Sequence, residues 1–411
     1  MLPYRNIRIT WLLLLSVGLL FQFACKKESL SSNPPKINQL RAISPAPNDS
    51  VLTAALPGQY LVIQGSNLRS AHSISFNGFP ATFNPGIFSD ENLVVAVPLI
   101  AWDSIPAGKL NILEVTTAGG TASYTFTVTA PVPSVSAISN ENAVAGQEIT
   151  ISGSDFYGIT KVTFPGGKDV TTIKANSSKS LTLTVPDGVG SGPVQITGAY
   201  GSGLSTIIFN NHVAPAVGFL ANFTDGDPYF GWQWWGGNKT GDASIFPNNT
   251  GNYIQVHPPS AIGPNNGGWY ADNRAVMVDK KEWLPNANLS DPISNYALKF
   301  EISVKEPWKN GAFMIVPNGN FNFMARYAPW ETSATKEYTT NGTWQTVVIP
   351  LTKFLSGTGS YNASGAPAAS IGGLTGGTNA ASMQFMLYND SATPLESFNA
   401  AIDNVRIVKL N

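Results

Sequence analysis

The chain has 411 residues, more than a typical domain of about 100 to 200 residues. Charged residues make up only 12% and the formal net charge is −1, so the sequence lacks the basic face that a nucleic-acid partner requires. Cys25 is the only cysteine, which excludes an intrachain disulfide. The histidines, His72, His212 and His257, are too far apart for metal-ligand spacing, so we expect no zinc or other catalytic metal site.

The composition predicts an all-β protein. Thr, Ser, Gly, Asn and Val are abundant, as in β-strands and tight turns. Helical periodicity is missing beyond the N-terminus, where short alternating segments follow one another instead. We therefore expect several domains built of many short strands.

The N-terminus has the pattern of an export signal. Arg5 and Arg8 precede an apolar run, residues 11–24, which is short for a membrane span. The run ends at Ala24-Cys25, and this arrangement resembles a bacterial lipoprotein signal, whereas a cysteine without a role is the alternative. The resemblance implies that residues 1–25 end in a lipidated Cys25, whose acyl chains would be the only membrane anchor. Residues 26–35 are a polar tether.

An internal repeat follows the tether. Four separate motifs recur at a constant offset of 88 residues. Gly65 recurs as Gly153, Phe76 as Phe164 and Pro98 as Pro186, and each pair is 88 residues apart. The motifs alternate apolar and polar residues, which predicts half-buried strands in two sandwiches, residues 36–130 and 131–211. Gly65 and Gly153 are interpreted as strand ends where the chain turns sharply.

Both copies resemble IPT/TIG domains of the immunoglobulin-like fold. The resemblance rests on the segments Ile43-Ser44-Pro45 and Ile63-Gln64-Gly65-Ser66-Asn67-Leu68 and on their second copies. Such domains act as spacers, adhesin stalks and dimerisation modules, so they indicate a fold and leave the function open. Trp102 is the only tryptophan of the repeats, and packing against the next domain is favoured over ligand contact.

Residues 215–411 form a third domain with five legible strands. They are residues 296–304, 312–316, 344–351, 383–388 and 400–408. The segments Trp344-Gln345-Thr346-Val347 and Ile402-Asp403-Asn404-Val405 resemble parts of jelly-roll carbohydrate-binding modules. A closing strand with Asp403 could supply one oxygen ligand to a structural Ca²⁺, as in some of these modules, but no cofactor is otherwise expected.

The whole chain resembles the surface glycan-binding proteins of Bacteroidota. The resemblance implies an outer-membrane lipoprotein that faces the cell exterior and holds a polysaccharide such as xyloglucan, another β-glucan or a mannan. Its implied partners are that polysaccharide, an outer-membrane glycan importer and the hydrolases beside it.

Tryptophans are concentrated in the third domain, where Gly, Asn and Pro surround them. Indole and phenol rings stack on the C–H faces of sugars, and neighbouring polar groups bind the hydroxyls. Loop positions favour glycan binding by six residues: Trp308, Trp330, Tyr327, Arg326, Trp269 and Tyr270. Trp344 is predicted to lie in the core, Trp283 stays undecided, and at least one residue of Trp232, Trp234 and Trp235 is expected to be core.

Two other function classes remain open. A glycoside hydrolase needs a pair of carboxylates about 5 to 10 Å apart, and the acidic residues of the third domain do not exclude one. However, this domain is small for a hydrolase and lacks a Gly-x-Ser-x-Gly motif, so we expect no enzyme. A protein-binding adhesin would have the same stalk, although its tip would not need so many tryptophans.

Overall fold

The computed structural model describes residues 32–211, 217–224, 238–268, 273–357 and 363–410. The chain divides into two compact units between Ala130 and Pro131, and each is described by itself. None of the helices in the described ranges combines the length and the apolar character needed to cross a bilayer.

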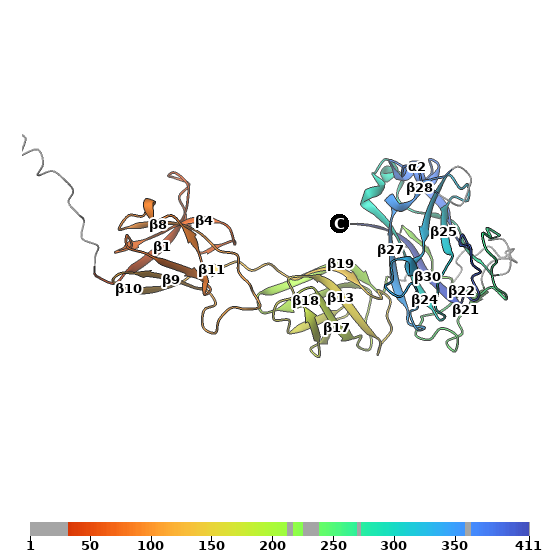
Figure 1. The fold of residues 1–411 in the computed structure, drawn as a ribbon, viewed down its shortest axis with the longest axis horizontal. Helices are drawn as coiled ribbons and strands as arrows, with labels where there is room; N and C mark the ends of the chain where they lie inside the picture. The colour runs from red at the N-terminus through yellow and green to blue at the C-terminus, as the bar shows by residue number, and fades with distance from the viewer. Residues whose placement is uncertain (1–31, 212–216, 225–237, 269–272, 358–362, 411) are drawn as a thin grey trace, which may run out of the picture. The chain divides into compact units, whose positions relative to one another are not determined.

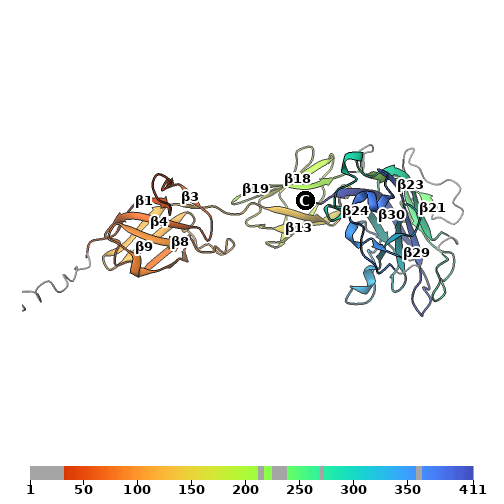
Figure 2. The same cartoon turned by 90° about the horizontal axis from the view of Figure 1, so that it is seen from above.

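The first unit is a β-sandwich whose sheets have the strand orders β2-β1-β4-β8-β7 and β10-β9-β5-β6 (Figure 2). A parallel pair, β11-β3, closes one end. Its strands are β1 (Lys36–Ala42), β2 (Val51–Leu52), β3 (Ala54–Ala55), β4 (Tyr60–Ser66), β5 (Ser73–Phe76), β6 (Phe79–Pro80), β7 (Thr82–Phe83), β8 (Asn92–Ala96), β9 (Ile112–Thr117), β10 (Gly120–Thr125) and β11 (Thr127–Val128), with the 3₁₀ helix η2 (Pro85–Ile87). Trp102 is buried.

The second unit begins with another sandwich, with strand orders β12-β13-β17-β16 and β15-β14-β18-β19. Its strands are β12 (Ser134–Ile138), β13 (Glu148–Ser154), β14 (Lys161–Phe164), β15 (Lys168–Val170), β16 (Lys174–Ser177), β17 (Ser180–Thr184), β18 (Gly192–Gly198) and β19 (Gly201–Phe209). The sequence repeat is therefore a structural repeat: β4 and β13, β5 and β14, and β8 and β17 each begin 88 residues apart (148 − 60, 161 − 73 and 180 − 92). The predicted tandem immunoglobulin-like sandwiches are confirmed.

Gly65 and Gly153 each lie one residue before the end of their strand, close to the predicted position, and they also mark close backbone contacts. Each lies inside its strand, opposite an irregularity in the neighbouring strand. A β-carbon on Gly65 would overlap the carbonyl oxygen of Lys36, and one on Gly153 would overlap that of Ser134. Only glycine fits where two backbones come so close.

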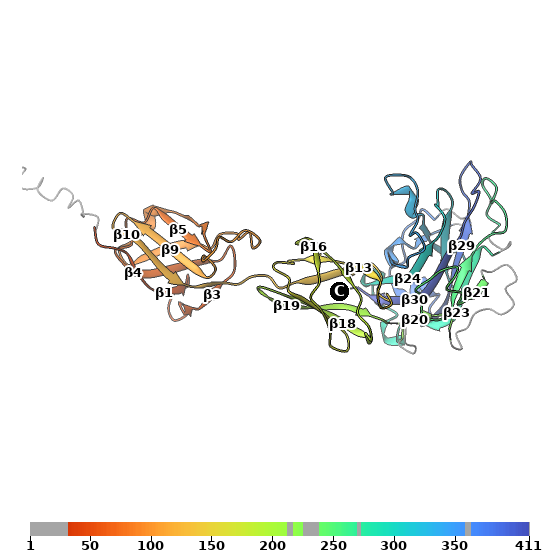
Figure 3. The ribbon, with the colours of Figure 1, turned by 90° about the horizontal axis from the view of Figure 1, so that it is seen from below.

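Residues 217–410 form a larger β-sandwich (Figures 1 and 3). One sheet has the order β21-β22-β30-β24-β27, with β20 also paired to β30, and the other has the order β23-β29-β25-β26-β28. The strands are β20 (Phe219–Ala221), β21 (Asn238–Thr240), β22 (Tyr253–Val256), β23 (Ala275–Glu282), β24 (Tyr296–Val304), β25 (Ala312–Pro317), β26 (Phe323–Tyr327), β27 (Gln345–Pro350), β28 (Leu355–Ser356), β29 (Ala380–Tyr388) and β30 (Ala400–Lys409). Short helices are η3 (Asn286–Asn288), η4 (Ile293–Asn295), η5 (Pro329–Glu331), η6 (Leu351–Lys353) and α2 (Ile371–Thr375).

The core of this sandwich lies between its two sheets. Phe300 and Ile302 of β24 meet Phe313 of β25 and Phe385 of β29 there. Every residue of β24 is nevertheless buried, whereas its alternating sequence predicts a strand with one exposed face. The second face of β24 is covered as well, and the cover comes partly from the preceding immunoglobulin-like domain.

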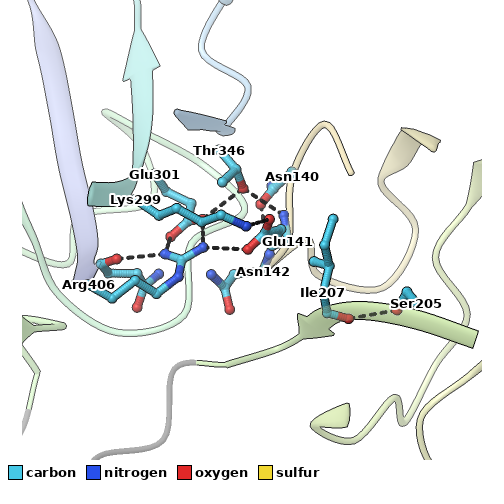
Figure 4. Close-up of polar contacts among 10 residues, drawn as sticks. Asn140, Glu141, Asn142, Ser205, Ile207, Lys299, Glu301, Thr346 and Arg406 are labelled. Carbon is cyan, nitrogen blue, oxygen red and sulfur yellow. Dashed lines mark hydrogen bonds and ion pairs between the residues drawn. The ribbon is translucent and has the colours of Figure 1, made fainter. Parts of the chain in front are cut away.

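A buried ion cluster joins the two domains (Figure 4). Glu141 belongs to the immunoglobulin-like domain, and its carboxylate accepts hydrogen bonds from Lys299 Nζ at 2.5 Å and Arg406 Nη2 at 2.7 Å. Arg406 also pairs with both carboxylate oxygens of Glu301 at 2.9 Å. Thr346 completes the cluster: its hydroxyl donates to Glu301 and accepts from the Glu141 amide, while its own amide donates to the Ser139 carbonyl.

Charge balance makes Glu141 essential to this interface. Burial alone would lower the pKa of Arg406, but the pKa is raised because Glu301 and Glu141 stabilise the guanidinium. Without Glu141, the buried Lys299 ammonium would lose its carboxylate partner and Arg406 would keep only Glu301. A buried charge that loses its partner is costly because the low-dielectric interior does not replace the lost solvation.

Replacing Glu141 by glutamine should therefore lower the free energy of unfolding by about 3 kcal/mol. Urea unfolding followed by tryptophan fluorescence measures this, because eight of the ten tryptophans lie in the C-terminal domain. Glu148→Gln, an exposed site on β13, is the matched control and should change stability by about 0.5 kcal/mol or less. Equal costs for the two variants would contradict the proposed role of Glu141.

Candidate functional site

The outer face of the β23-β29-β25-β26-β28 sheet carries a second apolar cluster. Alternation along β25 directs Phe313 and Ile315 into the main core and Met314 to the opposite face. The outer cluster contains four of the protein's six methionines, Met277, Met314, Met324 and Met386, together with Ala275, Ala312 and Val316. Partly buried side chains pack over it, among them Phe321 and Tyr388. The methionines themselves are buried, at 0 to 4% exposure, so they form an adaptable floor beneath the partly buried rings and do not themselves present a surface.

Arg326 stands beside this floor with its guanidinium held in place. Its Nε donates to Asp390 Oδ2 at 3.0 Å, its Nη2 donates to Asp390 Oδ1 at 3.2 Å, and its Nη1 lies 2.8 Å from Glu331 Oε2. The pKa of Arg326 is raised, since these two carboxylates outweigh the opposing effect of burial. Its side chain remains 29% exposed. A guanidinium has five N–H donors, so two remain for a ligand, next to carboxylate oxygens that can accept.

A cavity of about 630 Å³ opens next to Arg326. Met314 and Met324 of the outer cluster line one side, and Ile349 and Pro350 of β27 line another. Lys353, Leu355, Ala363 and Ser364 complete the wall, with Tyr327 and Val348. The volume is in the range of small-molecule sites, and apolar walls with a few polar groups are typical of them.

Trp308 is not part of a binding surface, and its prediction as a sugar-binding residue was wrong. Its side chain is completely buried, and its Nε1 donates to the Asn310 carbonyl at 2.7 Å. The loop folds back, because the Trp308 backbone pairs with that of Tyr338. The indole therefore packs edge-to-face against core rings, including those of Phe313 and Phe398, and does not project from a loop tip.

The other described candidates differ in how much of each side chain a ligand could reach. Trp330 is partly buried against the core, and its Nε1 donates to the Gly311 carbonyl at 2.8 Å. The ring of Tyr327 contacts Phe300 and Trp308 edge-to-face, and burial raises its pKa well above the usual value. Tyr327 thus presents mainly its cavity-facing side, and binding by Tyr327, Trp330 and Arg326 stays a prediction.

Several aromatic predictions lie outside the described residues. These are Trp269 and Tyr270, which precede β23 in sequence, and Trp232, Trp234 and Trp235; Cys25 lies outside as well. Trp344 is buried against Phe246 and Tyr253, so its prediction as a core residue is confirmed. Trp283 is completely buried and donates to the Ala381 carbonyl at 3.0 Å.

Sequence reasoning missed Met314, Met324, Asp390 and Lys353. Alternation in residues 312–316 does place Met314 opposite Phe313, but it does not tell which face is the core. The pairing of Asp390 with Arg326 spans 64 residues, and no local pattern indicates it.

Calcium binding by Asp403 stays a prediction. Its carboxyl is buried, which raises its pKa well above the usual value and favours the neutral acid. The Asn404 amide donates to Oδ1 at 2.7 Å. Across the described ranges, no group of three or more His, Cys, Asp and Glu side chains could hold a metal ion, whereas Ca²⁺ needs six to eight oxygens.

The burial of Trp308 predicts a structural role. Trp308→Ala should lower the free energy of unfolding by about 3 to 5 kcal/mol, because it leaves a cavity among core rings. Trp330→Ala is the matched control and should cost less, since that indole is only partly buried. Urea denaturation of both variants measures the difference, and a smaller cost for Trp308→Ala would contradict this assignment.

Comparison with known proteins identifies both kinds of domain in the second unit. Residues 215–409 match the family of the surface glycan-binding protein B xyloglucan binding domain, and residues 133–211 match the IPT/TIG domain. An IPT/TIG domain-containing protein of Bacteroides ovatus is 27% identical over 199 residues, 44% of this chain and 40% of that relative. The match thus spans about two fifths of the relative's length.

One solved structure has the same fold. The surface glycan-binding protein PbSGBP-B of Prevotella bryantii aligns over 91% of this chain and 98% of its own, with 24% identity and a TM-score of 0.67. SGBP-B from a complex xyloglucan utilization locus in Bacteroides uniformis aligns over 92% and 99%, with 19% identity and a TM-score of 0.49. Residues 215–409 thus belong with the xyloglucan binding domain of surface glycan-binding protein B and residues 133–211 with the IPT/TIG domain, and the chain shares the fold of PbSGBP-B.

Proposed function

We propose that this protein captures xyloglucan or a related β-glucan at the cell surface without cleaving it. The match of residues 215–409 to a xyloglucan-binding domain carries this proposal. The glycan would lie over the outer face of the β23-β29-β25-β26-β28 sheet, above the methionine floor.

The chemistry of this face suits a neutral sugar. Phe321 and Tyr388 lie at the surface of the apolar cluster, and aromatic rings of this kind pack against sugar C–H groups. Arg326, Asp390 and Glu331 offer hydrogen-bond donors and acceptors close together, as neighbouring hydroxyls on one sugar ring require. Since the guanidinium is already fixed by its carboxylates, little side-chain entropy would be lost on binding.

Four carboxylates of the C-terminal domain, two of them at the candidate site, are already engaged or buried, which favours binding without catalysis. Asp390 and Glu331 are both engaged by Arg326, and Glu301 and Asp403 are buried beneath or beside the domain interface. A glycosidase needs one carboxyl as acid and another as base or nucleophile, both facing the scissile bond. An adhesin that binds a protein is the second candidate, but the family of the C-terminal domain favours a glycan.

The surface location would come from lipidation of Cys25. Residues 26–35 and the two immunoglobulin-like domains would then separate the binding face from the membrane. A protein that only holds glycan serves uptake by passing it on, so an outer-membrane importer and its hydrolases are the proposed partners.

Native gels containing soluble polysaccharides test the function, with protein that starts at Lys26. We expect xyloglucan to retard the wild type and Arg326→Ala to bind about tenfold more weakly, through lost charge-assisted hydrogen bonds. Lys280→Ala, which removes an exposed charge on β23 at the far edge of the sheet, is the control and should behave as the wild type.

Two results would contradict the proposal. One is the absence of retardation by xyloglucan, mixed-linkage β-glucan and glucomannan. The other is release of reducing sugar during incubation, which would instead show a hydrolase.

A further inference from the structure

We propose that the cavity beside Arg326 binds a sugar branch of a substituted β-glucan whose main chain lies on the outer sheet face. This inference rests on the proposed function and adds the feature of the ligand that determines specificity. It follows from where the cavity lies, how it is walled and which polar groups face it.

The cavity exists because β28 is short. Its two residues pair with Phe323 and Met324 only, so within the described ranges Ala325–Tyr327 of β26 have no strand partner on that side. The chain leaves β27 at Pro350 and passes through η6, which sets Lys353 opposite this free edge. The result is a gap at the edge of the sandwich.

The cavity is continuous with the candidate binding face. Met314 and Met324 belong both to the methionine floor and to the cavity wall, and Arg326 stands at the boundary. The two methionines are buried, so the accessible connection is at Arg326, and a group attached to a chain that passes Arg326 can enter the cavity there.

The walls favour a short substituent over the main chain of a polymer. The space is surrounded on several sides by β26, the β27–η6 segment, β28 and residues 363–364. The main chain of a polymer would need a way in and a way out, whereas a short branch needs one opening. The apolar walls would contact sugar C–H groups, and Lys353 and Ser364 would bind hydroxyls. Both residues are exposed, and among the described residues none pairs with the Lys353 ammonium.

Isothermal titration calorimetry with two ligands tests this inference. The probes are a branched xyloglucan oligosaccharide and unbranched cellohexaose, titrated into protein that starts at Lys26. We expect the wild type to bind the branched ligand more tightly, because cellohexaose leaves the cavity without sugar. Lys353→Ala and Ser364→Phe should each weaken branched-ligand binding about tenfold and leave cellohexaose affinity within about twofold.

Lys280→Ala is again the matched control, and thermal unfolding of each variant checks that the fold is kept. Equal wild-type affinity for both ligands would overturn the branch assignment and leave the glycan-binding function standing. Equal weakening of both ligands, or of neither, by the cavity variants would overturn it in the same way. Failure of the wild type to bind either ligand would overturn the proposed function and this inference together.

Discussion

The buried pairing of Glu141 with Arg406 and Lys299 is the constraint on which the second unit depends. Arg406 and Lys299 lie on neighbouring strands of one sheet, and Glu301 pairs only with Arg406, so burial of Lys299 depends on Glu141. The immunoglobulin-like domain supplies the second carboxylate, so this face of the sandwich is satisfied only when both domains are in place. The interface thereby holds one sheet of the C-terminal sandwich against the preceding immunoglobulin-like domain.

The other sheet carries the candidate binding site. The sheet that contains β24 and β30 has charged residues on its outer face, and those residues are covered. The sheet that contains β25 and β29 has buried methionines on its outer face, under partly buried rings such as Phe321 and Tyr388, with Arg326, Asp390 and a cavity beside them. The two faces of one sandwich thus have different chemistry, one suited to attachment and the other to an adaptable contact with sugar rings.

Much of the fold could be predicted from the sequence, because strands and repeats are local patterns. The constant 88-residue offset predicted two copies of one domain, and residues 296–304 were predicted as a strand with the bounds of β24. Burial was harder to predict. Alternation in β24 predicted one exposed face, but Glu141, 158 residues from Lys299, helps to cover that face. Contacts between residues so far apart in the sequence cannot be predicted from a short stretch of it.

The candidate site was predicted only in part, for the same reason. Trp308 lies between two strands, which is typical of a loop tip, yet its backbone pairing with Tyr338 turns the indole into the core. Arg326 was predicted as a binding residue, but its partner Asp390 lies 64 residues away in the sequence. The cavity depends on the short length of β28, and no residue type signals a strand that stops early.

Hydrogen–deuterium exchange with and without xyloglucan tests the central claim most directly, because it locates bound ligand along the whole chain. The proposed site predicts slower exchange in residues 318–333 and 363–370 around the outer sheet face, with little change in residues 36–130. Slower exchange confined to the immunoglobulin-like domains or to the Glu141 interface would contradict it.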